Sequence, residues 1–125
     1  MRVLIVEPSQ DLAGVISKSF NGSGVVADIA HTAQMGISRA DENKPDMVVL
    51  EVLISEHNGL EFIHEFKSYN DWFDIPIVIY SDLSAEELGR AVNWREDMNI
   101  IKHFYKPTTT LRELNRYVRG VLNEN

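Results

Sequence analysis

Short runs of apolar, β-branched residues alternate along the chain with segments in which apolar side chains recur at helical spacing. Two of the runs, Val3–Val6 and Met47–Leu50, are apolar at every position. Such runs are typical of strands in a parallel sheet, because helices cover both faces of that sheet. The predicted strands are Val3–Val6, Val25–Ala30, Met47–Leu50, Ile75–Tyr80 and Asn99–Phe104.

Each predicted strand is followed by a predicted helix, and capping residues mark several of the helix starts. Thr32 is a predicted N-cap. The sequence Ser84-Ala85-Glu86-Glu87 has the spacing of a capping box, in which Ser84 and Glu87 satisfy each other's backbone N–H groups. The predicted helices cover residues 12–20, 32–43, 60–69 and 84–95, and a last helix opens among residues 108–110.

This order of elements predicts a (βα)5 α/β fold. It is a doubly wound three-layer sandwich, in which a five-stranded parallel sheet lies between two layers of helices. No linker, repeat or low-complexity stretch interrupts the pattern, so residues 1–125 are expected to form one domain. Open sheets of this kind gather their functional groups at the carboxyl ends of the strands. The polar residues at those ends are therefore the candidate site.

Composition limits where in the cell the protein is expected and which kinds of molecule are expected as its partners. The formal net charge is −7, from 19 acidic and 12 basic residues, which disfavours nucleic acid as a partner of this domain. The chain contains no cysteine, which excludes disulfides and thiolate metal sites and fits the cytoplasm. No apolar run has the length of a membrane span or of a signal peptide. We expect a cytoplasmic protein without a membrane partner.

Four strand ends carry polar residues that suit one kind of chemistry. The first strand ends in Glu7-Pro8, the third in Glu51, the fourth in Ser81-Asp82, and the fifth runs into Lys106-Pro107. A carboxylate, a hydroxyl and an ammonium on one edge would suit a phosphoryl group. The carboxylate would carry the group, and the other two would bind its oxygens.

With these residues the chain resembles the receiver domain of two-component response regulators over essentially its full length. The matching segments are Val3–Glu7, Pro45–Glu51, Asn58–Phe62, Ile75–Ser81 and Lys106–Pro107. The resemblance implies a flavodoxin-like receiver fold of the chemotaxis-regulator type and a non-enzymatic role in phosphorelay signal transduction. In that family an acid pair after the first strand binds Mg²⁺ and an aspartate after the third strand is phosphorylated. A Ser or Thr after the fourth strand and a Lys before a Pro complete the site.

Carried over by position, the family's site is altered in two of its three acids. The positions are Glu7 for the first acid, Pro8 for the second, Glu51 for the phosphoacceptor, Leu53 for a metal-binding backbone carbonyl, Ser81 for the hydroxyl and Lys106 for the lysine. The resemblance is therefore to an atypical member, a pseudo-receiver.

These two changes weaken the expected chemistry. Mg²⁺ requires octahedral oxygen ligands at about 2.1 Å, and Pro8 offers no side-chain oxygen. We therefore expect no cofactor, or only weak Mg²⁺ at Glu7, Glu51 and Leu53. Glutamate also moves the carboxylate by one carbon–carbon bond, about 1.5 Å, and a misplacement of about 1 Å already costs roughly a hundredfold in rate. Phosphorylation of the usual kind is not expected.

Three interpretations of Glu51 follow from the residues. It forms a structural ion pair with Lys106 in a decayed site, or its fixed charge mimics a phosphorylated aspartate. The third possibility is residual metal binding, or regulation by something other than phosphate. Two other classes of protein stay open: a competent, Mg²⁺-dependent phosphoacceptor, and a flavodoxin-like ligand binder. The last would need a phosphate-binding loop after the first strand, and Glu7-Pro8-Ser9-Gln10 is a poor one.

Two residues beside the site have alternative interpretations. Asp82 either repels an incoming phosphate or faces solvent near the start of the next helix. His103 stands where the family often has a Tyr or Phe that reports activation, so it is a candidate switch position together with Ser81. As a lone histidine at a strand end it is otherwise a half-exposed packing residue, with a pH-sensing role as a weaker option. His31, His57 and His64 are interpreted as surface residues.

A partner surface is expected on the fourth helix and fifth strand, the family's usual partner or dimer face. It carries Arg90, Trp94 and Arg95, and Trp and Arg are enriched among interface anchors. The expected partners are a histidine kinase, a downstream regulator or a second copy of the chain. Trp72 and Phe73 form a second aromatic cluster, in a segment expected to cover the amino-terminal edge of the sheet.

Overall fold

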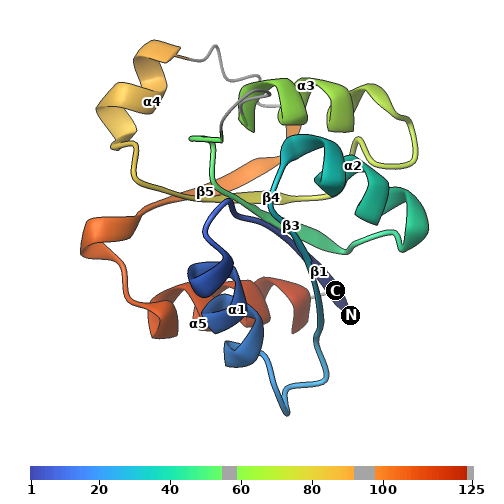
Figure 1. Cartoon of the computed structure of the whole chain (residues 1–125), viewed down its shortest axis with the longest axis vertical. Coiled ribbons are helices and arrows are strands. Elements are labelled where there is room, and N and C mark those ends of the chain that lie inside the picture. Colours follow the sequence, from blue (N-terminus) through green and yellow to red (C-terminus); the bar gives the residue numbers. More distant parts are fainter. Residues whose placement is uncertain (55–58, 92–97, 124–125) are drawn as a thin grey trace.

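The computed structural model describes residues 1–54, 59–91 and 98–123, with the backbone alone at residues 90 and 91. Strands and helices alternate along the chain in the predicted order (Figure 1). The strands are β1 (Arg2–Val6), β2 (Val26–Ala30), β3 (Met47–Leu50), β4 (Ile77–Ser81) and β5 (Ile100–Tyr105). The α-helices are α1 (Gln10–Ser19), α2 (Ala33–Glu42), α3 (Gly59–Ser68), α4 (Ala85–Ala91) and α5 (Leu111–Asn123).

The strands form one parallel sheet in the order β2-β1-β3-β4-β5. Helices α1 and α5 cover one face, and α2 and α3 cover the other (Figure 1). The predicted fold class, a doubly wound three-layer α/β sandwich, is confirmed. In this topology β1 and β3 are neighbours and β4 and β5 follow on one side, so the carboxyl ends of these four strands line one edge.

The hydrophobic core lies in two layers, one on each face of the sheet. Phe62, Phe66 and Trp72 belong to the layer beneath α2 and α3, and Phe20 belongs to the layer beneath α1 and α5. All four residues of β3 are buried. This burial is the physical reason for the unbroken apolar runs in the sequence, because a central strand meets side chains on both faces.

Side-chain caps fix the helix starts where the sequence predicts them. Thr32 Oγ1 accepts a hydrogen bond from the Met35 backbone N–H at 3.1 Å. Ser84 Oγ accepts from the Glu87 N–H at 3.2 Å, and Glu87 Oε1 accepts from the Ser84 N–H at 3.1 Å. The predicted N-cap and capping box are both confirmed. The predicted continuation of this helix beyond residue 91 lies outside the described residues.

The predicted bounds of β4 and β5 are shifted by one or two residues. β4 begins at Ile77 rather than Ile75 and ends at Ser81, and the register with β5 shifts between Ile77 and Val78. Asn99 has a φ of 56°, so it turns the chain into β5 instead of belonging to it. A left-handed residue is sterically disfavoured within a strand. Ile75 is buried, which explains why its apolar character was mistaken for the start of the strand.

The connection from α3 to β4 covers the amino-terminal end of the sheet. Trp72 is buried there, with its ring stacked on Phe66 at 5.1 Å and edge-on to Tyr69 at 4.7 Å. Lys67, near the end of α3, is also buried, which its place in a helical pattern does not indicate. Its ammonium donates to the Phe73 carbonyl at 2.9 Å and to the Ile75 carbonyl. Burial lowers the pKa of Lys67 from 10.5 to about 8.

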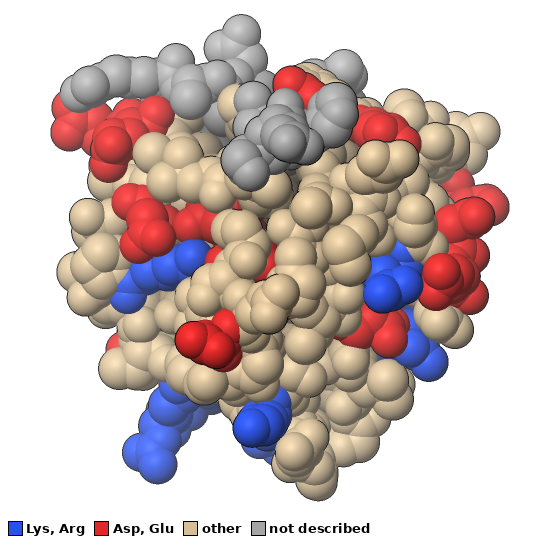
Figure 2. Space-filling model, viewed as in Figure 1, with Lys and Arg blue, Asp and Glu red and all other residues tan. Residues whose placement is uncertain are grey.

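The surface is unevenly charged. Figure 2 shows acidic side chains both on the side of α4 and on the opposite side, near α2, with basic ones among and below them. The outer side of α5 carries Arg112, Arg116 and Arg119, all exposed. No helix in the described part of the chain has the length and apolar character needed to cross a membrane.

Candidate functional site at the strand ends

The Glu51 side chain is buried directly after β3, with every carboxylate contact made by a donor. Oε2 accepts from the Ser81 hydroxyl and from the Leu53 backbone N–H at 3.0 Å. Oε1 accepts from the Asp82 backbone N–H at 3.0 Å and from Lys106 Nζ at 2.9 Å. Four donors from three chain segments therefore converge on one carboxylate.

Lys106 joins Glu51 to Glu7, across the carboxyl ends of β1, β3 and β5. Its Nζ lies 2.6 Å from Glu7 Oε1 and 2.9 Å from Glu51 Oε1. The side chains of Glu7 and Glu51 are 4% and 2% exposed, and that of Lys106 is 12% exposed. Removal of one partner from a buried pair costs about 3–5 kcal/mol, because the remaining charge stays buried. The three side chains therefore depend on one another.

Hydrogen bonding outweighs burial in setting the charge states. Burial alone would raise the pKa of the Glu51 carboxyl, but the bonds from Ser81, Leu53, Lys106 and Asp82 hold it below its ordinary value of 4.5. Burial alone would lower the pKa of Lys106, and the bonds to Glu7 and Glu51 raise it above 10.5. Both groups are thus charged at neutral pH.

The Tyr80 ring adds an aromatic wall on the β4 side. Its centroid lies 5.6 Å from Lys106 Nζ, within the range of a cation–π contact. Burial raises the pKa of the Tyr80 hydroxyl, although the charge of Lys106 acts in the opposite direction. The ammonium is thus enclosed by two carboxylates and an aromatic face.

The loop after β1 is tied to Glu7 from both sides. Glu7 Oε2 accepts from the Ser9 backbone N–H at 2.9 Å, and Pro8 between them is exposed and supplies no side-chain oxygen. His31 Nδ1 lies 3.0 Å from the Glu7 carbonyl oxygen. His31, interpreted as a surface residue, is half-buried and braces this loop. His64 is exposed as expected, and residue 57 lies outside the described residues.

The residues present do not fit the octahedral Mg²⁺ site that the family implies. Each oxygen of Glu51 already accepts two hydrogen bonds from protein donors, and Glu7 gives one oxygen to Lys106 and the other to the Ser9 N–H. Pro8 provides no ligand. Across the described residues, no group of three or more His, Asp or Glu side chains could hold a metal ion. The ammonium of Lys106 takes the bridging position between the two carboxylates.

The loop after β4 connects the buried carboxylate to the start of α4. Ser81 Oγ donates to Glu51 and accepts from the Leu83 backbone N–H at 3.0 Å. His103 Nε2 lies 2.9 Å from the Leu83 carbonyl oxygen. The Asp82 side chain is 61% exposed and 3.8 Å from Lys106 Nζ, so it sits at the mouth of the site. The loop is thus held from Glu51 on one side and from β5 on the other.

The charged side chains at this edge are predictable from the sequence, but the backbone donors are not. The N–H groups of Leu53 and Asp82 supply two of the four bonds to Glu51. Every residue except proline carries such a donor, so the sequence has no signal for which one points inward. At Leu53 the resemblance implies a role for the carbonyl, whereas in the structure the N–H bonds to Glu51. Of the expected partner surface, Trp94 and Arg95 lie outside the described residues, as does the side chain of Arg90.

Fold and site together define an open-sheet α/β domain with an acidic, lysine-bridged site at its strand ends. The family model for the response regulator receiver domain matches residues 3–116. The chain belongs to this family, whose members are signalling modules of two-component systems.

Relatives of known sequence match part or nearly all of the chain. It is 31% identical over 84 residues to the KDP operon transcriptional regulatory protein KdpE of Escherichia coli, covering 67% of this chain and 36% of KdpE. It is 28% identical over 120 residues to the response regulator ArlR of Staphylococcus haemolyticus, covering 96% of this chain and 52% of ArlR. The chain therefore spans about a third to a half of the length of these relatives.

Solved structures support the fold. The chemotaxis protein CheY4 of Vibrio cholerae superposes with a TM-score of 0.80 at 17% identity, covering 96% of this chain and 97% of CheY4. At this identity the likeness concerns the fold alone.

Proposed function

We propose that this receiver domain signals through protein–protein interaction without being phosphorylated in the usual way. In this proposal Glu51 supplies a permanent negative charge, and the domain is an atypical receiver, or pseudo-receiver. The observation that carries the proposal is the set of four donors on the Glu51 carboxylate.

Those donors are of the kind that would otherwise bind a phosphoryl group. A hydroxyl, an ammonium and two backbone N–H groups form charge-assisted bonds to anionic oxygens. In a phosphorylated receiver the anion stands beyond the aspartate, and the longer glutamate carries its own anion outward in the same direction. The convergence of Ser81, Lys106 and both N–H groups on Glu51 supports mimicry of the phosphorylated state. It favours this over a simple ion pair, which would need Lys106 alone.

Hydrogen bonds connect the charged Glu51 carboxylate to the loop that precedes α4. Ser81 and Asp82 bond to Glu51, and Ser81 also holds the Leu83 N–H at the entry to α4. His103 completes the arrangement from β5 through the Leu83 carbonyl. In this proposal Ser81 and His103 act as switch positions that keep the loop in one conformation. The partner, a histidine kinase, a downstream regulator or a second copy, would recognise the α4 and β5 face.

The same geometry argues against a competent phosphoacceptor. Both oxygens of Glu51 are engaged, so an incoming phosphoryl group would find no free nucleophile. Glu7 gives one oxygen to Lys106 and the other to the Ser9 N–H, and Pro8 supplies no second acid, so the ligand set for Mg²⁺ is incomplete. We accordingly propose that Mg²⁺ binding is absent or weak, that the domain has no enzymatic activity, and that it works in the cytoplasm beside other two-component proteins.

Three proteins test the proposal: the parent, Glu51→Asp, and the double variant with Pro8→Asp and Glu51→Asp. Each is incubated with Mg²⁺ and a small-molecule phosphodonor, and acid-labile phosphate is followed by intact-protein mass. We expect no phosphorylation of the parent and a gain in the double variant, because aspartate restores the carboxylate position and the second acid restores a metal ligand. Phosphate on the parent would overturn the proposal. Phosphate on Glu51→Asp alone would show that Pro8 does not limit the site.

A further inference from the structure

Two adjoining cavities open on the surface formed by β5 and α5, on the side of the molecule opposite α2 and α3 (Figure 1). The first has a volume of about 390 Å³ and is lined by Lys102 and Phe104 of β5 and by Arg112, Glu113, Arg116 and Tyr117 of α5. The second, of about 490 Å³, includes Arg119 and shares Arg112 and Arg116 with the first. We call them the aromatic cavity and the arginine cavity. Because they share two side chains, one ligand can reach into both.

The floor of the aromatic cavity is apolar and partly open to solvent. The Phe104 and Tyr117 rings meet edge to face, with their centroids 5.4 Å apart, and both residues are half-buried. The Tyr117 hydroxyl donates to the Ile101 carbonyl at 3.3 Å, which fixes this ring beside β5. Aromatic rings that stay partly exposed on a fixed support are suited to stacking against a flat ring of a ligand.

Four cations surround this floor. The Lys102 ammonium lies 5.4 Å from the Phe104 centroid and 5.8 Å from the Tyr117 centroid. The other three are exposed arginines on the outer side of α5, namely Arg112, Arg116 and Arg119. Among the residues that the structure describes, no carboxylate forms an ion pair with any of these cations. The positive charge is therefore directed to solvent.

Glu113, an acid in the lining of the aromatic cavity, is held at the start of α5. Its Oε1 accepts from the Thr110 backbone N–H at 3.3 Å and from the Thr110 hydroxyl at 3.2 Å. Thr110 Oγ1 in turn accepts from the Glu113 N–H at 3.1 Å. This capping box uses the carboxylate to satisfy the helix start, so Glu113 does not serve as the counter-charge of the arginines.

The arrangement of the arginines opposes the stability of α5. Arg112 and Arg116 are four residues apart, and Arg116 and Arg119 are three apart, so their like charges repel on one face of the helix. Arg112 also stands in the first turn, where the helix dipole disfavours a positive charge. The chain as a whole has a formal net charge of −7. A basic cluster without an internal counter-charge, in an otherwise acidic domain, indicates an anionic ligand.

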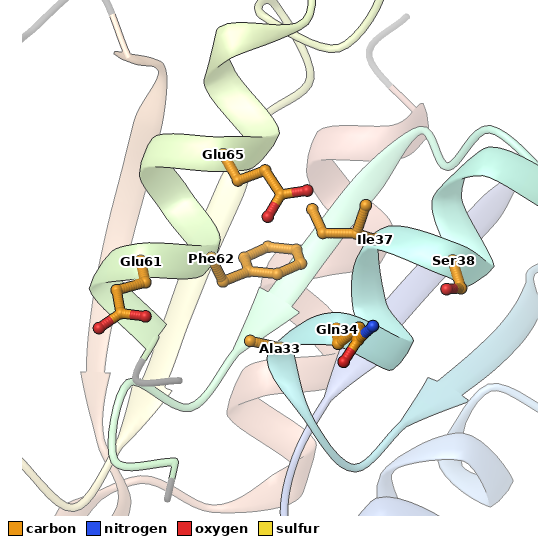
Figure 3. Close-up of a pocket in the computed structure, with 7 residues that line it drawn as sticks. All are labelled: Ala33, Gln34, Ile37, Ser38, Glu61, Phe62 and Glu65. Carbon is orange, nitrogen blue, oxygen red and sulfur yellow. The ribbon is translucent and has the colours of Figure 1, made fainter. Parts of the chain in front are cut away.

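The opposite side of the molecule is acidic and offers a ligand little apolar surface. Figure 3 shows the cavity between α2 and α3, where Glu61 and Glu65 stand beside the Phe62 ring. Phe62 is only 1% exposed, so its ring belongs to the core. An anion would be repelled there, whereas the surface of β5 and α5 would attract it.

We propose that the aromatic and arginine cavities together bind a nucleoside polyphosphate. The base would stack on Phe104 and Tyr117, and the phosphates would extend along α5 to Arg116 and Arg119. A guanidinium group binds phosphate oxygens through two parallel hydrogen bonds, and every nucleobase offers a flat face for stacking. Both cavities have volumes usual for small-molecule sites.

An acidic peptide is a poorer occupant. Its carboxylates would pair with the arginines, but they do not need the flat apolar floor that adjoins the arginines here. A nucleotide uses the rings and the cations at once. The inference goes beyond the proposed function and does not depend on the state of Glu51.

The test uses ATP that carries an N-methylanthraniloyl fluorophore on its ribose, and fluorescence anisotropy measures its binding to the full chain. Unlabelled ATP and inorganic tripolyphosphate then compete with this probe. We expect ATP to compete at least about tenfold better than tripolyphosphate, because stacking of the base adds to the phosphate contacts. Phe104→Leu should remove most of this difference and leave the affinity for tripolyphosphate within about threefold.

Two variants of α5 test the arginine cavity. Arg116→Glu reverses a charge that both cavities share and should weaken ATP binding about tenfold or more. Gly120→Leu fills the arginine cavity without changing the charge and should weaken binding about tenfold. Beyond its chain neighbours and the backbone of α5, no described atom lies within 4 Å of a Cβ built on Gly120. Leucine also favours a helix over glycine, so this variant should fold.

Lys44→Glu is the matched control for Arg116→Glu. It makes the same change in net charge at an exposed residue in the connection from α2 to β3. The affinity for ATP should stay within about threefold of the parent, because a distant surface charge contributes little.

Several outcomes would overturn the proposal. If tripolyphosphate competes as well as ATP with the parent, the arginines bind anions without a base. If Lys44→Glu weakens binding as much as Arg116→Glu, the attraction is only the overall charge. If Gly120→Leu has no effect, the phosphates do not occupy the arginine cavity. If ATP fails to compete at about 1 mM, the fluorophore and not the nucleotide is bound. Single-stranded oligoadenylate that competes about a hundredfold better than ATP would assign the surface to an RNA strand.

Discussion

The site depends on Glu51, because its buried carboxylate accepts four hydrogen bonds. These bonds hold together the donors from Leu53, Ser81, Asp82 and Lys106. Replacement by Gln keeps the shape and removes the charge. It also places an amide N–H₂ against at least one donor. At pH 7 we expect Glu51→Gln to lower the free energy of unfolding by about 3 kcal/mol, measured by urea denaturation.

The pH dependence of this effect has a defined sign. The pKa of Glu51 is lowered by its hydrogen bonds, so its contribution is complete above the ordinary value of 4.5. It is lost as the pH falls through the lower, folded-state pKa. The gap between wild type and Glu51→Gln should therefore close under acid conditions. Glu42→Gln is the control, because it breaks only an exposed pair with Arg39 and should cost under about 1 kcal/mol; an equal loss in both variants would contradict the prediction.

Residue patterns gave the positions of the site but not its contacts. Glu51, Ser81 and Lys106 each follow or end an apolar run, and strand ends meet at one edge of a parallel sheet, so their proximity was predictable. Lys67 was not predictable, because it stands among helical residues as an exposed lysine would. The loop carbonyls of Phe73 and Ile75, placed by tertiary packing, and the nearby charge of Asp74 make its burial tolerable.

At the scale of elements, α3 is seated on the loop that carries the Glu51 site. The Gly59 N–H donates to the Val52 carbonyl at 2.9 Å, and a Cβ on Gly59 would lie 2.4 Å from Val52 Cα. Backbone cannot give way as a flexible side chain can. We therefore expect Gly59→Ala to lower stability by about 1–3 kcal/mol and to shift the amide resonance of Leu53, which bonds to Glu51.

Gly14, inside α1, is the matched control for this prediction. Beyond its chain neighbours and the backbone of α1, no described atom lies within 4 Å of a Cβ built on it. Gly14→Ala should therefore raise stability by about 0.5–1 kcal/mol through the lower entropy of the unfolded chain, and leave the Leu53 resonance in place. If Gly59→Ala behaves like Gly14→Ala in thermal unfolding, α3 does not press on the loop as described.

Element order was the most predictable property, and element ends were the least. The apolar runs of β1, β3 and β4 are strands buried on both faces, whereas the edge strands β2 and β5 are only partly buried. Ile75 shows why ends fail: its side chain is buried, as an apolar pattern implies, but its backbone lies before β4. Side-chain burial and strand pairing coincide inside an element and separate at its ends.

At the scale of the whole molecule, buried ionisable groups lie at both ends of the sheet. Folding stabilises the charged form at one end and destabilises it at the other. The carboxyl ends hold Glu51 and Lys106, whose charged forms are stabilised by each other. At the amino-terminal end the Lys67 ammonium donates to two backbone carbonyls, and burial lowers its pKa to about 8, although the charge of Asp74 acts in the opposite direction. Folding therefore favours the charged form at one end and disfavours it at the other.

This difference predicts a rise in stability under mildly alkaline conditions. Between about pH 8 and 10.5 the unfolded chain holds a proton on Lys67 that the folded chain has released, so the free energy of unfolding increases with pH. The full range corresponds to about 3 kcal/mol. The titration should stop near pH 10, because the contributions of Tyr80 and Lys106 change above that value.

Lys67→Met isolates the effect, since methionine fills a similar volume and does not titrate in this range. The variant loses the bonds to the loop carbonyls at every pH, which shifts its curve by a constant amount. The slope of the free energy of unfolding against pH therefore measures the proton that Lys67 releases on folding. We expect wild type to gain stability relative to Lys67→Met from pH 8 to 10 in urea denaturation. Parallel curves would mean that Lys67 keeps an ordinary pKa despite its burial, with the ammonium fully compensated by the carbonyls of Phe73 and Ile75.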